Sequence, residues 1–480
     1  MRAARAGAAA WGIAFAAMLL TGTAAVHATD KDAAKRAEVA AEPAEEEDAF
    51  DKPSVLTSNG IDPAWRKALR ESGVRVRAIY TGDLFTTLSG GFSQGTTFGG
   101  RLDLGLEADL EKLVGWKGAT FHVNAFLIHG RGQTTDHIGN LFTITNAEAV
   151  PSARLFELWL EQKIGTIGSL RIGQLAADSE FITSDRAGLF INGIFGWPDI
   201  TGVDLPSGGP SYPLATPGVR LQLDFGESTK FRLGVFNGDP AGPFRPGLDP
   251  NPQRRDPDGL AFRLNDGVFL IGELEHKYKL GPAGLPGAVK AGVWYNSESF
   301  DDQRFDTIGR SLANPFSTGI PAGHRPNWGP YVIIDQTLIK LPSKAKEDRN
   351  IGAFARISGS PDDRNLISFY ADTGIVVKGP FPSRPDDAFG IGVAYAKVSG
   401  RARGLDFDTQ RFGIPGFPIR DYEALIEVSY KYQVMDGWTL QPDFQYVMHP
   451  GGRIPDPLAP TPTIAIKNAA VFGVRTVVQF

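Results

Sequence analysis

Ionisable side chains recur at every second position along much of this chain. In the segment 101–110, Arg101, Asp103 and Glu107 alternate with apolar residues that begin at Leu102. Because successive residues of a strand point to opposite faces, one face of such a strand is charged and the other is apolar. Unpaired ions are costly in a dry core, so the charged face requires water. This spacing therefore supports ion pairing and hydrogen bonding to polar solutes on a wetted wall.

The same alternation predicts which residues face water in other segments. The water-facing set includes Glu157, Trp159, Glu161, Arg220, Gln222, Asp224, Gln441, Asp443 and Gln445. The opposite, apolar set includes Phe156, Leu158, Leu160, Val219, Leu221, Phe225, Phe444, Phe472, Val474, Val478 and Phe480. An alternation that returns along almost the whole chain indicates a wall between lipid and water, because a soluble core strand would show it only once.

Residues typical of catalysis are poorly placed in this sequence. Ser93 lies in a Gly-Phe-Ser-Gln-Gly stretch that fits the nucleophile-elbow pattern, but it occurs in a Gly/Ser/Thr-rich hairpin, which indicates a coincidental turn. The histidines share no metal-ligand spacing, and the chain has no cysteine. We therefore expect no catalytic residue, no metal site and no cofactor.

The N-terminal region predicts export. Residues 1–28 have a basic start, a short apolar stretch and small residues near the end, which is typical of a signal peptide. Residues 29–60 are mostly charged or small, so we expect an acidic, flexible periplasmic tail. Without the signal peptide and the segment 30–51, the chain has 44 basic and 45 acidic residues, and no nucleic-acid partner is expected.

The remainder predicts an all-β fold. A short helix is expected at 61–73, capped by Asp62 and ended by Gly73. Residues 74–480 then predict a transmembrane, antiparallel, up-and-down β-barrel of about sixteen strands. The expected strands lie near 74–87, 101–110, 119–129, 154–162, 169–175, 218–225, 230–237, 268–279, 288–297, 331–341, 351–358, 365–375, 389–398, 421–432, 439–447 and 469–480.

The connections between these strands tend to alternate between short and long. Bacterial outer-membrane barrels have short periplasmic turns and long external loops, so this alternation supports the barrel. The rule fails at 359–364, which is short where a long loop is due. Either that hairpin lies low on the outside, or the count of strands is wrong by a pair.

A barrel of sixteen strands is wide enough for a water-filled lumen. Selectivity then depends on which loop folds inward and on the charges and aromatic rings at the narrowest point. The longest connection, 176–217, is too apolar for a solvated loop and contains Trp197. We expect it to pack inside the barrel, with an external lid or a subunit contact as the alternatives.

Several stretches resemble one known family. They are RLFELWLEQ, LRIGQLAADSEF, FINGIFGWP, GPSYPLATPGVRL, GVFNGDP, RISGSPDDRNLISFYADTGIVVKGPFPSRPDDAFGIGVAYAKVS and LQPDFQYVMHPGG. Together they are similar to the carbohydrate-selective porins of the OprB type over nearly everything from Trp65 to Phe480. The resemblance implies an outer-membrane barrel that admits monosaccharides, typically glucose, through a narrowed channel lined by charged and aromatic residues.

A sugar presents apolar faces that stack on aromatic rings and hydroxyls that pair with charged groups. On this basis we expect pore-lining or sugar-binding roles for Arg101, Asp103, Glu107, Glu157, Trp159, Arg171, Arg220 and Trp197. The alternative is that each is an ordinary lumen residue held in a transverse network of ion pairs.

The expected function is therefore passive, selective diffusion of small sugars across the bacterial outer membrane. A general or differently selective porin is the first alternative, and an outer-membrane barrel enzyme or an adhesin is less favoured. Expected partners are small sugars, the surrounding lipid and lipopolysaccharide, and the barrel assembly machinery, through the strand that ends in Phe480. The choice between monomer and homo-oligomer remains open.

Overall fold

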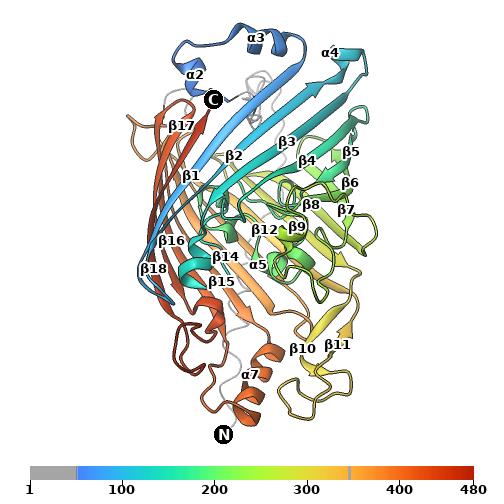
Figure 1. Cartoon of the computed structure of the whole chain (residues 1–480). Helices are drawn as coiled ribbons and strands as arrows, with labels where there is room; N and C mark the ends of the chain where they lie inside the picture. Colours follow the sequence, from blue (N-terminus) through green and yellow to red (C-terminus); the bar gives the residue numbers. More distant parts are fainter. Residues whose placement is uncertain (1–49, 51, 344–347) are drawn as a thin grey trace, which may run out of the picture. The chain divides into compact units, whose positions relative to one another are not determined.

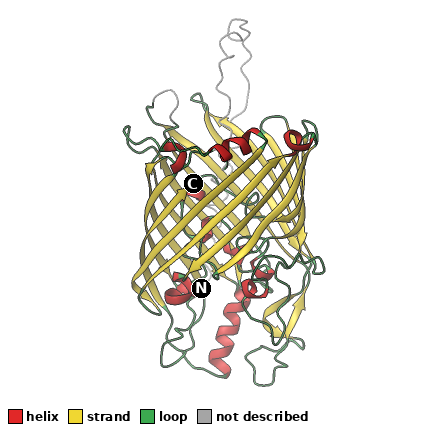
Figure 2. Ribbon diagram, turned by 45° about the horizontal axis from the view of Figure 1, so that its top comes forward, coloured by secondary structure: helices red, strands yellow, loops and turns green. Residues whose placement is uncertain are grey.

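Sixteen antiparallel strands close into a single barrel (Figures 1 and 2). The computed structural model describes residues 50, 52–343 and 348–480, so the predicted signal peptide and most of the predicted tail lie outside the described residues. The barrel closes where β1 pairs with β18, in a register that runs from Ile79 opposite Gln479 to Gly91 opposite Lys467. The predicted fold class and number of strands are confirmed.

Each barrel strand overlaps one of the predicted ranges. The strands are β1 (Val74–Gly91), β2 (Thr96–Asp109), β3 (Ala119–Gly130), β4 (Ser152–Lys163), β5 (Gly168–Leu175), β6 (Thr216–Phe225), β7 (Thr229–Asn237), β8 (Val268–Leu280), β9 (Leu285–Asn296), β12 (Asn327–Lys340), β13 (Asn350–Gly359), β14 (Ile367–Lys378), β15 (Ala388–Val398), β16 (Tyr422–Met435), β17 (Trp438–Met448) and β18 (Lys467–Gln479). A two-stranded hairpin of β10 (Phe300–Asp306) and β11 (Pro321–His324) lies in the loop after β9.

The helices are short and lie before β1 or in the connections between strands. They are α2 (Val55–Ser58), α3 (Ala64–Glu71), α4 (Leu110–Val114), η1 (Thr134–Ile138), η2 (Ala187–Leu189), η3 (Gly193–Phe195), α5 (Asp199–Gly202), η4 (Pro206–Gly208), α6 (Pro252–Arg255), α7 (Gly400–Phe412) and η5 (Pro450–Gly452). Among the described residues, no helix is long and apolar enough to cross a membrane.

The predicted N-terminal helix is confirmed as α3, but the expected cap is wrong. Pro63 occupies the cap position without a side-chain hydrogen bond, and Asp62 instead forms an ion pair with Arg70. Just before α3, the residues of α2 are also structured, because Ser54 caps α2 and Arg66 donates to the Ser54 hydroxyl at 3.5 Å. The predicted boundary of the tail at residue 60 therefore lies several residues too far along the chain, because α2 is already structured.

Two elements at the end with long loops were not predicted. Helix α7 lies next to the β10–β11 hairpin (Figure 1), and the Arg304 guanidinium on β10 pairs with Asp408 on α7 at 2.8 and 3.1 Å. The glycine-rich start of α7 hides its helical pattern, since glycine is a poor helix former. Packing of α7 against β10 stabilises the helix, although the residues of α7 favour a helix only weakly on their own.

The short connection 360–366, between β13 and β14, occurs in a barrel that has the predicted number of strands. Strands β13 and β14 pair along their whole length, so no pair of strands is missing. Asp204, from the long loop between β5 and β6, accepts hydrogen bonds from the Ile367 amide at 3.1 Å and the Ser360 hydroxyl at 3.3 Å. The exception to the loop rule is therefore a hairpin that lies low and is held from within the barrel.

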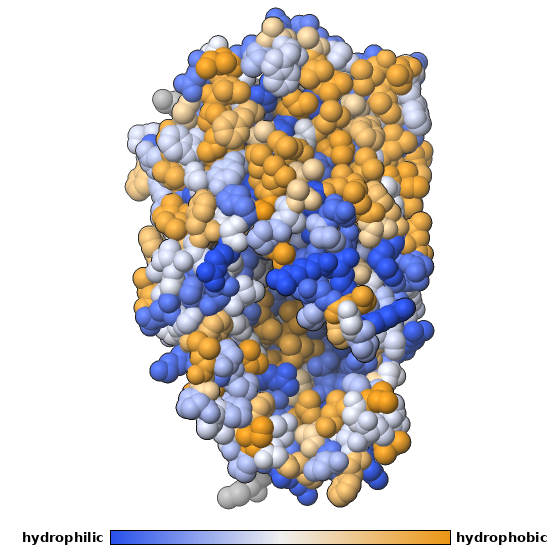
Figure 3. Space-filling view, viewed as in Figure 1, coloured by the Kyte–Doolittle hydropathy of each residue, from blue (hydrophilic) through white to orange (hydrophobic). Residues whose placement is uncertain are grey.

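The two faces of the wall follow the predicted alternation. Outward side chains such as Phe225 and Phe472 are 58% and 46% exposed, whereas the inward Arg220 and Asp443 are buried. Figure 3 shows apolar side chains gathered over the part of this face where the strands run, and a hollow with polar residues nearer the long loops. The apolar band faces lipid, as a barrel in a membrane requires.

Strand β4 departs from strict alternation. Between β3 and β4 the register shifts, so that Val123 faces Leu158 but Ala125 faces Leu155. The extra residue in β4 turns Phe156 inward, where its ring lies 4.7 Å from that of Phe126. The predicted outward position of Phe156 is therefore wrong, because one bulged residue changes the face of those before it.

Candidate functional site

The loop between β5 and β6, residues 176–215, lies inside the barrel. Its buried apolar residues Ile191, Ile194 and Phe195 pack in one cluster with inner-wall residues, among them Phe354. Glycines of β15 leave room for this packing, since a Cβ at Gly392 would lie only 2.8 Å from the Phe195 ring. We call residues 176–215 the inner loop.

A buried ion pair of the wall clamps the inner loop. Arg356 of β13 pairs with Asp372 of β14, with nitrogen–oxygen distances of 2.5 to 3.1 Å. The same guanidinium donates to the carbonyl oxygens of Ile182, Ile194 and Gly196 at 3.0 to 3.1 Å. One arginine therefore fixes three points of the inner loop.

Carboxylates of the wall bind backbone amides of the loops. Glu427 on β16 accepts from the amides of Ile191 at 2.6 Å and Asn192 at 3.1 Å. Glu423, four residues earlier, accepts from Leu141 and Phe142 of the loop between β3 and β4, both at 2.8 Å. Each side chain accepts two backbone amides of one loop, so the two carboxyl groups hold both loops against the wall.

Residues of the two loops, of β2 and of α6 line a chamber of about 610 Å³. Its lining includes Arg101, Thr145, Asn146, Glu148, Asp178, Trp197, Ser207, Tyr212 and Gln253. Arg101 lies with its guanidinium carbon 4.7 Å from the centre of the Tyr212 ring and 4.8 Å from that of Phe126. The chamber therefore offers a cation, aromatic rings and several hydrogen-bonding groups together.

Trp159 lies outside the chamber, in a stack on the inner wall. The His122 ring is parallel to it, with ring centres 4.6 Å apart, and the Arg171 guanidinium carbon lies 3.7 Å from its ring centre. The Trp159 side chain is buried. With its ring stacked between these two groups, it has little surface to offer a solute.

Beside this stack lies a square of four charges. Arg171 pairs with Glu161 at 3.0 Å and with Glu180 at 2.6 Å. Arg220 pairs with the same two carboxylates at 2.5 and 2.6 Å. Glu180 belongs to the inner loop and the other three residues to β4, β5 and β6, so the charge square joins the loop to the wall with no net charge.

The remaining predicted residues are also engaged in the wall. Asp103 pairs with Arg77 at 2.9 Å, and Glu107 pairs with Arg75. The Glu157 carboxylate accepts from the Ala176 amide at 3.1 Å, which fixes the start of the inner loop. Of the eight predicted residues, Arg101 and Trp197 line the chamber, and the other six stabilise the wall around it.

The chamber residues that the sequence did not identify include Tyr212, Asp178 and Glu148. All three lie in loops, where no periodic pattern marks an inward position. Asp178 accepts from the Tyr212 amide at 2.8 Å, which ties the two ends of the inner loop together. The stretch GPSYP, which contributes to the family resemblance, was the one signal for Tyr212.

Two chamber carboxyls titrate near neutral pH. Burial raises the pKa of Asp178 to about 6, although the Tyr212 amide and Arg101 act to lower it. Burial likewise raises the pKa of Glu148 to about 7, against the lowering effect of hydrogen bonds from Thr134 and its neighbour. Both groups are therefore neutral at pH 5 and ionised at pH 8.

We expect the cation preference of the channel to rise with pH between 5 and 8. Deprotonation of Asp178 and Glu148 adds negative charge to the chamber, which attracts cations. The measurement is the reversal potential of single channels in a potassium chloride gradient at both pH values. Asp178→Asn combined with Glu148→Gln should flatten this dependence, and an unchanged dependence in that variant would assign it to other groups.

A closed sixteen-strand barrel with a charged inner wall and an internal chamber defines the class of outer-membrane porins. A sequence model of the carbohydrate-selective porin family, OprB, matches residues 93–480. The chain belongs to this family, whose members are channels and not enzymes.

Individual relatives agree with this assignment. Porin B of Pseudomonas aeruginosa is 24% identical over 439 residues, which cover 85% of this chain and 88% of the relative. A putative porin, QuiX, of Acinetobacter baylyi is 24% identical over 410 residues, which cover 81% and 87%. The high-pH structure of Pseudomonas putida OprB has a TM-score of 0.75 and 22% identity, covering 90% of this chain and all of that one. This last likeness shows the shared fold.

Proposed function

We propose that the chain conducts small neutral sugars of the size of glucose through the chamber. The observation that supports this proposal is the joint placement of Arg101, Trp197 and Tyr212 around 610 Å³ of space. Pockets for small molecules commonly have volumes of about 300–1,000 Å³. The inner loop, which supplies Trp197 and Tyr212, is the part that narrows the channel.

The chemistry of this lining suits a pyranose. Apolar sugar faces stack on aromatic rings, while hydroxyls pair with guanidinium and carboxylate groups. The Trp197 indole N–H donates to the Gly208 carbonyl at 3.1 Å, which fixes the ring. We propose that Arg101 and Trp197 contact the sugar, and that the other six predicted residues act by holding the wall.

In single-channel recordings, glucose should reduce the current through the parent protein in a saturable way. For Arg101→Gln and Trp197→Ala, the apparent affinity should fall by about three- to tenfold, since one such contact contributes about 0.5–1.5 kcal/mol. Trp159→Phe is the matched control, because it changes a stacked ring outside the chamber. Equal blocking in the parent and both chamber variants would contradict the proposed sugar site.

A general diffusion porin is the second candidate, favoured by the balanced charge square, which selects neither cations nor anions. Liposome swelling with glucose and with charged solutes of equal size would distinguish the two. The recognition of the C-terminal strand, which precedes Phe480, by the assembly machinery stays a prediction.

A further inference from the structure

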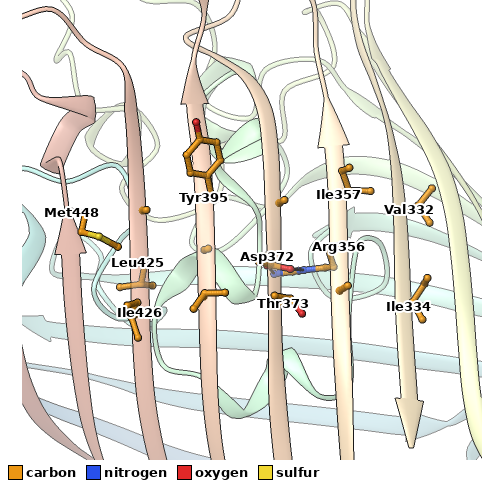
Figure 4. A pocket seen from close by; sticks show the side chains of 15 residues that line it. Val332, Ile334, Arg356, Ile357, Asp372, Thr373, Tyr395, Leu425, Ile426 and Met448 are labelled. Carbon is orange, nitrogen blue, oxygen red and sulfur yellow. Dashed lines mark hydrogen bonds and ion pairs between the residues drawn. The ribbon is translucent and has the colours of Figure 1, made fainter. Parts of the chain in front are cut away.

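The outer face of the barrel is hollowed over β12 to β17, away from the solute pathway. The hollow has a volume of about 640 Å³, and Figure 4 shows the residues that line it. Small outward residues, Ala355, Ala371 and Ala424, alternate with larger ones across these strands. The larger ones include Ile357, Tyr395, Ile426 and Met448. The hollow is almost entirely apolar, so it suits a hydrocarbon chain.

The strand register shows how the hollow is built. One cross-strand row contains Ile357, Ala371, Tyr395, Ala424 and Met448, in that order from β13 to β17. Each alanine in this row lies between two bulky residues. A groove deeper than the surrounding wall results, because an alanine side chain ends at its Cβ atom.

A lysine lies directly beyond this row, toward the external loops. Lys397 is two residues after Tyr395 on β15, about 7 Å further along the strand. It pairs in register with Phe369 on one side and Tyr422 on the other. The Tyr395 and Tyr422 rings stack with centres 5.3 Å apart. Aromatic rings at this height are typical of the membrane interface.

Two basic residues lie at the external end of this row. Lys397 and Arg403 are exposed, and neither takes part in an ion pair with any described residue. Arg403 lies in the first turn of α7, directly after β15, and its amide donates to the Ser399 carbonyl at 3.0 Å. Two acids lie near this region. Asp421 is paired with Arg453 at 3.6 Å and lies 2.9 Å from the His449 ring nitrogen, and Asp362 accepts the Gly400 and Arg401 amides at the start of α7.

We propose that this site binds the lipid A part of lipopolysaccharide. One acyl chain lies in the hollow, and a phosphate of the sugar headgroup lies on Lys397 and Arg403. The two basic residues favour an anionic lipid, because opposite charges attract. They lie beside the external loops, so the lipid would belong to the outer leaflet. The site lies outside the lumen and does not rest on the proposed sugar function.

The test is native mass spectrometry of the full chain in detergent, titrated with diphosphoryl lipid A, phosphatidylethanolamine or phosphatidylglycerol. We expect lipid A to give an adduct at concentrations at least about tenfold lower than either phospholipid, since two charge-assisted contacts are added. Lys397→Ala combined with Arg403→Ala should remove this preference, and Ala371→Leu should weaken binding by filling the hollow.

Matched controls separate specific binding from general affinity for lipid. Lys340→Ala removes an exposed lysine at the opposite end of β12, and Val235→Leu enlarges an outward residue on β7. Both should bind lipid A like the parent. Heat-modifiable mobility on gels verifies that each variant is folded. Equal lipid A binding by the Lys397/Arg403 variant, or equal binding of all three lipids by the parent, would overturn the proposal.

Discussion

Arg356→Met is expected to release the inner loop and to raise the single-channel conductance. The substitution removes three hydrogen bonds to loop carbonyls and leaves Asp372 without its buried partner. Loss of one member of a buried ion pair costs about 3–5 kcal/mol. We therefore expect a loss of that order in the free energy of unfolding, measured with urea in detergent micelles. Discrimination between glucose and larger sugars should fall at the same time.

A second variant separates the clamp from general stability. Arg356→Met combined with Asp372→Asn removes the uncompensated charge and keeps an acceptor for the Tyr370 hydroxyl, which lies 2.5 Å from Asp372. This double variant should recover part of the stability, because no lone charge remains buried. Its conductance should stay high, since the loop carbonyls still lack a donor. A double variant with the conductance of the parent would show that Arg356 does not hold the loop.

The barrel wall could be predicted from the sequence because its pattern is local. Alternation of Arg220, Gln222 and Asp224 with apolar residues reports two environments that a strand meets on its two faces. The same logic failed at Phe156, since a bulge depends on the pairing with β3 and leaves no mark in the composition of β4. The strands could thus be predicted from the sequence. The face to which each side chain points could be predicted only where the strand is regular.

The chamber could be predicted only in part, because its contents depend on where the loops fold. Trp159 and Trp197 are equally aromatic in the sequence, yet the first is stacked between His122 and Arg171 while the second lines the chamber. The difference arises from the inner loop, which is held by Arg356 from a distant part of the chain. Such long-range contacts carry no periodic signal.

Glu180→Gln is expected to turn the channel toward anion preference. The substitution leaves Arg171 and Arg220 to share Glu161, so the charge square changes from neutral to one net positive charge. A unit charge about 4 Å from an ion changes its energy by about 1 kcal/mol in water, which corresponds to about fivefold for each ion. Because the change has opposite signs for anions and cations, their permeability ratio should shift by up to about thirtyfold. Reversal potentials in a potassium chloride gradient at pH 8 measure this ratio, because at that pH the chamber carboxyls Asp178 and Glu148 are constantly ionised.

The expected shift in the permeability ratio depends on where the removed carboxylate lies. Two further variants test this dependence. Glu161→Gln removes the same charge from β4 and should shift the permeability ratio in the same direction and by a similar factor. Glu227→Gln removes a carboxylate from an exposed turn after β6 and should leave the ratio unchanged. If Glu161→Gln changed selectivity while Glu180→Gln did not, ions would pass along the wall without meeting the inner loop. A shift for both places the charge square, and with it this part of the inner loop, beside the path that ions take.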